Sequence, residues 1–142
     1  MYATPAAMEK RMKREYAAIY ADDAGVAQEQ LVLDDLAAAA AEIDGRLAVR
    51  YAVPVIASGA LLLLENWNII LAMELGYTRS EGVEIPEKIK NLADNVRKQL
   101  KAVTDGSLKL PAAPAENSSG AGSVAIISAA DPVFTREKME GF

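Results

Sequence analysis

The stretch from Gly59 to Gly76 constrains the fold more than any other part of this chain. Apolar side chains point in nearly every direction around a helix formed here, so no face of it suits water. The stretch is roughly long enough to cross a bilayer. Four polar residues interrupt it: Glu65, Asn66, Asn68 and Glu74. Because such groups are costly in lipid, we interpret it as the central helix of a soluble bundle, beginning at Ser58 and ending at Gly76.

Three other segments show the apolar spacing of amphipathic helices. The first begins at Thr4-Pro5, a capping residue followed by a proline suited to the first helical position. Its apolar stripe is Met8, Met12, Tyr16 and Ile19. We expect it to end near the turn at 22–25, and the sequence leaves open whether it is one helix or two short ones.

The remaining two stripes are longer. One consists of Leu33, Leu36, Ala40, Ile43 and Leu47, and the other of Ile85, Ile89, Leu92, Val96, Leu100 and Val103. Pro54 should stop the earlier helix near Tyr51, and Asp105-Gly106 should cap the later one. The predicted fold class is therefore mainly α, a bundle of about four helices. Helix content should be well above half within residues 4–104, with no sheet there.

Composition divides the chain into a helical core at 1–110, a linker at 111–123 and a C-terminal arm at 124–142. The linker is rich in Pro, Ala, Ser and Gly, which predicts a flexible connection. The arm contains a short β-like run at 124–128, so we expect it to dock on a partner or a neighbouring subunit. Its predicted contact residues are Val124, Ile126, Ile127, Phe134, Met139 and Phe142.

Two features predict contacts between subunits. The alanines at 37–41 leave a smooth helix surface that another backbone can approach closely, and the central helix carries more apolar surface than a small monomer can bury easily. The candidate interface residues are Ala37, Ala41, Leu62 and Trp67.

The chain has no histidine and no cysteine, which excludes Ser-His and Cys-His hydrolases, histidine-ligated metals, thiolate metal sites and disulfides. Asp34-Asp35, with Glu42 and Asp44, is the best carboxylate cluster for acid–base chemistry. Acids near a helix N-terminus are stabilising in themselves, so we favour a structural role. A calcium loop around Gly25 would lack three oxygen ligands, so a plain turn is preferred. We predict no catalytic site, metal or cofactor.

The net charge of −5, from 15 basic and 20 acidic residues, argues against nucleic-acid binding as the main role. The basic sides of the first and last helices carry no interleaved aromatic residues that could stack on bases. Salt bridges to a neighbouring subunit are the preferred interpretation of these lysines and arginines.

Three segments together resemble the small head–tail adaptor proteins of Mu-like tailed phages. They are the opening Met1-Tyr2-Ala3-Thr4-Pro5, the run from Ala41 through Leu47 to Arg50-Tyr51-x-Val53-Pro54, and the ending Phe134-Thr135-Arg136-Glu137-x-x-x-Gly141-Phe142. The resemblance spans nearly the whole chain in the right order.

The resemblance implies a non-enzymatic virion protein at the head–tail junction, present in the host cytoplasm during assembly. It implies a ring of about twelve subunits that binds the portal on one side and a tail-side stopper or terminator protein on the other. DNA would pass through without specific binding, and no membrane would be involved. The alternatives are a head-completion or tail-terminator protein of the same phage neck, a small DNA-binding regulator, and a carboxylate enzyme or small-ligand bundle.

Overall fold

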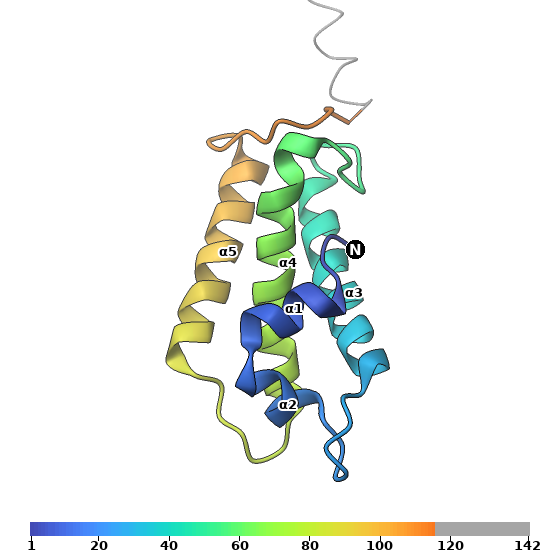
Figure 1. Cartoon of the computed structure of the whole chain (residues 1–142). Coiled ribbons are helices and arrows are strands. Elements are labelled where there is room, and N and C mark those ends of the chain that lie inside the picture. Colours follow the sequence, from blue (N-terminus) through green and yellow to red (C-terminus); the bar gives the residue numbers. More distant parts are fainter. Residues whose placement is uncertain (116–142) are drawn as a thin grey trace, which may run out of the picture.

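The computed structural model describes residues 1–115, which form a helical bundle (Figure 1). The helices are α1 (Pro5–Met12), α2 (Arg14–Tyr20), α3 (Glu29–Leu47), α4 (Ser58–Arg79) and α5 (Glu87–Asp105). Between residues 1 and 115 the only β pairings are isolated bridges. The predicted mainly α fold is confirmed. The predicted strand at 124–128 and the rest of the arm lie outside the described residues.

Helix α4 lies at the centre of the bundle and packs against both α3 and α5, while α1 and α2 cross in front of it (Figure 1). Judged by length and composition alone, α4 is the one helix within residues 1–115 that could cross a membrane. However, 56% of its most apolar window is buried inside the bundle. This burial is what the all-round apolar pattern of a core helix predicts.

The first predicted helix is two helices, so the bundle has five rather than about four. The chain breaks at Lys13, whose φ of 56° is left-handed and ends the α-helical hydrogen bonding. The break redirects the chain so that Met8 and Met12 before it, and Tyr16 and Ile19 after it, are all buried. The apolar stripe is therefore buried by two short helices rather than by one straight helix.

Helix α4 continues past Gly76, where the sequence predicts its end. Gly76 is buried inside the helix, and a Cβ there would lie 2.5 Å from the Tyr20 hydroxyl. The glycine therefore serves the close approach of Tyr20 rather than helix termination. The helix ends at Arg79, and the Ser80 hydroxyl donates a hydrogen bond to the Gly76 carbonyl.

The end of α5 is the predicted one, with Gly106 in the left-handed conformation at φ 86°. Beyond it, Leu110 is buried and residues 111–115 run beside the loop after α3. The Ala52 N–H donates to the Ala113 carbonyl at 3.2 Å, and the Ala115 N–H donates to the Arg50 carbonyl at 3.0 Å. The first five residues of the predicted linker are thus held against the bundle.

Candidate functional site

One end of the bundle carries an exposed apolar surface, which we call the end surface: Met1, Ile56, Leu61 and Leu62. Ile56 is 85% exposed and Leu62 is 78% exposed. An open groove of about 690 Å³ runs between these residues, and its lining is completed by Tyr2, Pro54, Val55, Ser58 and Glu65. Contiguous apolar surface of this kind on a small protein marks a contact site.

Tyr2 fixes the backbone segments that shape the end surface. Its hydroxyl donates a hydrogen bond to the Asp44 carboxylate on α3 and accepts one from the Val55 N–H at 3.0 Å. The Tyr2 and Ala3 N–H groups both donate to the Asn68 side-chain oxygen, at 2.9 and 3.0 Å. The chain start and the loop before α4 are therefore held in place before any partner binds.

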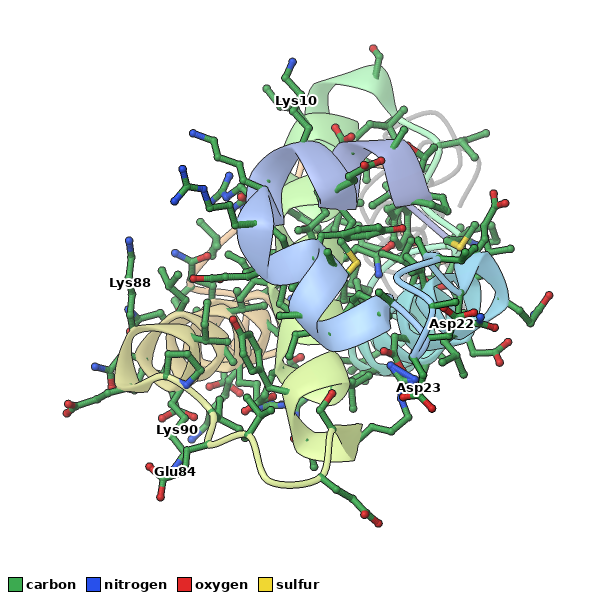
Figure 2. All side chains as sticks on the ribbon, turned by 60° about the horizontal axis from the view of Figure 1, so that its bottom comes forward. Lys10, Asp22, Asp23, Glu84, Lys88 and Lys90 are labelled. Carbon is green, nitrogen blue, oxygen red and sulfur yellow. The ribbon has the colours of Figure 1, made fainter. Side chains whose placement is uncertain are left out.

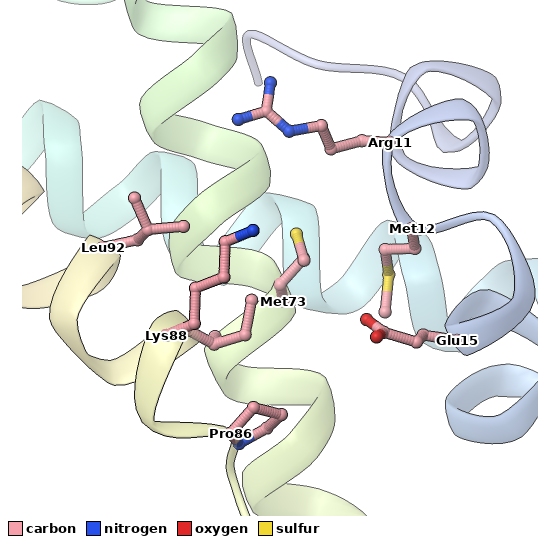
Figure 3. Close-up of a pocket in the computed structure, with 8 residues that line it drawn as sticks. Arg11, Met12, Glu15, Met73, Pro86, Lys88 and Leu92 are labelled. Carbon is pink, nitrogen blue, oxygen red and sulfur yellow. The ribbon is translucent and has the colours of Figure 1, made fainter.

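A smaller pocket of about 260 Å³ lies between α1, α2 and α5 (Figure 3). Its apolar lining includes Met12, Met73, Pro86, Ile89 and Leu92, and Arg11, Glu15 and Lys88 supply its charged groups. Glu15 accepts a hydrogen bond from the Tyr77 hydroxyl at 2.9 Å. The pocket thus combines apolar side chains with two cations and one carboxylate.

The carboxylates considered for acid–base chemistry are engaged in structural contacts. Asp35 accepts from Tyr20 at 2.8 Å and pairs with Arg79 at 2.6 Å, and burial raises the pKa of its carboxyl. Glu42 pairs with Arg97 at 3.0 Å, and Arg97 also pairs with Glu74 at 2.6 Å.

Asp34 accepts a hydrogen bond from the Gln30 amide at 2.9 Å, while Asp44 accepts one from Tyr2. Over residues 1–115, no group of three or more acidic side chains has the arrangement of a metal site. These carboxylates join α3 to the other elements rather than converge on a cavity.

Buried tyrosines make the folded chain sensitive to alkaline pH, because burial raises the pKa of Tyr2, Tyr16, Tyr20 and Tyr77. Burial, together with a hydrogen bond to a carboxylate, raises the pKa of both Tyr2 and Tyr77 to about 12 from an ordinary value of 10.0. Between these values the unfolded chain releases these protons while the folded chain keeps them. The stabilisation is therefore complete below pH 10 and is lost as pH rises through 12.

We expect the free energy of unfolding, measured with denaturant at several pH values, to fall between pH 10 and 12. A Tyr77→Phe variant should show a shallower fall, because the phenol that causes part of it is absent. An unchanged slope in this variant would contradict the contribution assigned to Tyr77.

The structure separates the four predicted subunit-interface residues. Ala37 and Ala41 lie exposed on α3, and Leu62 is part of the end surface. Trp67 was expected on an outer face, and this expectation is wrong. Its side chain is only 1% exposed, and its indole N–H donates to Gln99 on α5 at 2.8 Å. Trp67 is therefore a core residue. All six predicted arm residues lie outside the described part of the chain.

Sequence reasoning missed Met1, Ile56 and Leu61, which contribute to the end surface. Ile56 lies in the short segment between Pro54 and the start of α4, where no helical or strand periodicity could assign it to a face. The signal available was the occurrence of a large apolar residue in a short loop that follows a proline.

Comparison with known proteins identifies the family. The family model described as bacteriophage Mu, Gp36 matches residues 2–127. No curated protein sequence matches the chain. The family match agrees with the resemblance to Mu-like phage proteins and identifies a phage structural or morphogenesis protein. Because the match covers most of its length, the chain belongs to the bacteriophage Mu Gp36 family.

Proposed function

We propose that this protein is a head–tail adaptor subunit, which forms a ring between the portal and the tail and lets DNA pass. The observation that carries the proposal is the end surface, where Ile56 and Leu62 are the two most exposed large apolar side chains within residues 1–115. A subunit that joins two large assemblies needs such a contact face, and it needs no active site. We assign the end surface to contact with the portal.

The charge of the chain is compatible with a DNA conduit. A channel protein should let DNA slide, and a net charge of −5 disfavours tight binding of the phosphate backbone. The acidic helix α3 supports this role, since Arg46 is its single basic residue. A DNA-binding regulator would need the opposite balance.

The proposal predicts many copies of this chain on each portal ring. The experiment mixes purified full-length protein with portal rings of the same phage and measures the mass of the complex. We expect a ring of about twelve copies. One or two copies per portal ring would refute the adaptor role, and binding to the tail-tube protein instead would favour a tail terminator.

Charged substitutions test the part played by the end surface. Ile56→Asp and Leu62→Asp should each reduce portal binding by at least tenfold, because a carboxylate would be buried in an apolar contact. Val83→Asp is the matched control, since Val83 is 43% exposed in the loop at the opposite end of α4. Equal binding by all three variants would assign the portal contact to another face.

A further inference from the structure

The chain between α2 and α3 forms a projecting hairpin, residues 21–27 (Figure 1). Its two sides are joined by the Ala21–Ala27 bridge and by a hydrogen bond of 2.8 Å from the Asp22 N–H to the Val26 carbonyl. The Asp22 carboxylate accepts from the N–H groups of Ala24 and Val26, at 3.0 and 2.8 Å. The hairpin is thus ordered by its own contacts, and the conformational entropy lost on binding is small.

The tip of the hairpin presents an apolar side chain beside a free acid. Val26 is 61% exposed. Asp23 is exposed, and within residues 1–115 its carboxylate has no ion pair. The acids of this turn resemble a calcium loop only superficially. The structure gives Asp22 another role, because its carboxylate closes the turn by accepting two backbone hydrogen bonds. The side chains of Asp23 and Val26 have no such internal role.

The pocket between α1, α2 and α5 complements this tip. Its apolar side chains suit a valine side chain. Its two cations, Arg11 and Lys88, outnumber its one carboxylate, Glu15, so the pocket suits an acidic side chain from another copy (Figure 3). Neither Arg11 nor Lys88 forms an ion pair with any part of the chain that the structure describes. In Figure 2, Asp22 and Asp23 lie on one side of the molecule and Lys88 on the other. A hairpin therefore cannot reach the pocket of its own chain.

We propose that the hairpin of each copy binds the pocket of the next copy, with Val26 in the apolar pocket and Asp23 against Arg11 and Lys88. Because the two surfaces differ and lie on opposite sides, the contact is head-to-tail. Repeated head-to-tail contacts close into a ring when the rotation between copies allows it. This inference rests on the proposed adaptor function and adds the contact that holds its ring together.

Cross-linking tests the contact directly, because the chain contains no cysteine and introduced thiols are the only ones present. Ala24→Cys places a thiol at the hairpin tip, and Glu87→Cys places one at the start of α5 beside Pro86 and Lys88 of the pocket. On portal rings, a short bismaleimide should join the double variant into a ladder beyond the dimer. Each single variant should remain uncross-linked.

The matched control pairs Ala24→Cys with Lys101→Cys, an exposed position near the other end of α5. It should give no ladder. A ladder from this control, or cross-linked dimers from a single variant, would overturn the head-to-tail contact. Absence of a ladder from the Ala24–Glu87 pair on portal rings that carry many copies would overturn the contact and leave the adaptor function standing. If wild type binds in only one or two copies, both proposals fail.

Charge exchange provides the second test. Asp23→Lys and Lys88→Glu should each weaken association between copies about threefold to tenfold, and the effect should shrink at high salt. The double variant restores opposite charges and should recover most of the loss. If copies of the double variant associate more weakly than copies of either single variant, Asp23 and Lys88 do not face each other.

Discussion

Replacement of Asn68 by alanine is expected to lower the free energy of unfolding by about 3 to 4 kcal/mol. Asn68 is fully buried in α4, and its side chain satisfies backbone groups from two other segments. The oxygen accepts from Tyr2 and Ala3, and the amide donates to the Leu36 carbonyl on α3 at 2.9 Å. Alanine would leave two N–H groups unpaired, each costing about 1–3 kcal/mol, and would add a small cavity.

Thermal or denaturant unfolding would measure this loss, and a midpoint about 10 °C lower is expected for a chain of this size. Asn66→Ala is the matched control, because Asn66 is on the same helix, is partly exposed and has no side-chain hydrogen bond to any residue in 1–115. It should change stability by no more than about 0.5 kcal/mol. An equal decrease in the free energy of unfolding in the two variants would show that the Asn68 hydrogen bonds do not stabilise the fold.

The core could be predicted from sequence because helical burial is a local, periodic property. The stripe of α5 shows this well, since Ile89, Val96, Leu100 and Val103 are all buried as their spacing requires. The role of Asn68 could not be predicted in the same way. Its partners lie 66, 65 and 32 residues away in sequence, and no local pattern specifies them. Its position on the buried side of α4, with Leu64 and Leu71, was the available signal.

Trp67 illustrates why exposed and buried positions of an all-apolar helix are hard to separate. Leu62 and Trp67 belong to the same mostly apolar stretch, which Glu65 and Asn66 interrupt, and both were predicted to face a neighbouring subunit. Only Leu62 does lie exposed, because α5 covers Trp67 and supplies Gln99 for its indole N–H. Which side of a uniformly apolar helix is left open depends on where the other helices pack, and this information is not local.

Deletion of residues 124–142 is expected to leave the helical core folded and to prevent the joining of heads to tails. The described chain ends at Ala115, held at Arg50, so residues 116–123 are the remaining connection to the arm. With the flexibility that the sequence predicts for the linker, eight residues would span about 15 Å root-mean-square, and more when stretched. We expect this reach to bring the arm to a neighbouring subunit or the portal. The sequence predicts that the run from Val124 to Ile127 adds as a strand to an exposed sheet edge of the partner.

The apolar residues of the arm should supply most of its affinity, since burying one phenylalanine is typically worth a few kcal/mol. Full-length protein with serine at Phe134, Met139 and Phe142 should therefore fail in joining as the truncation does. A variant with alanine at Arg136, Glu137 and Lys138 keeps those apolar residues and serves as the matched control, with near-normal joining. The measurements are the yield of infectious particles and the thermal transition of each purified variant. Normal yields from the truncated protein would contradict docking by the arm, and loss of its thermal transition would show that the arm belongs to the folded core.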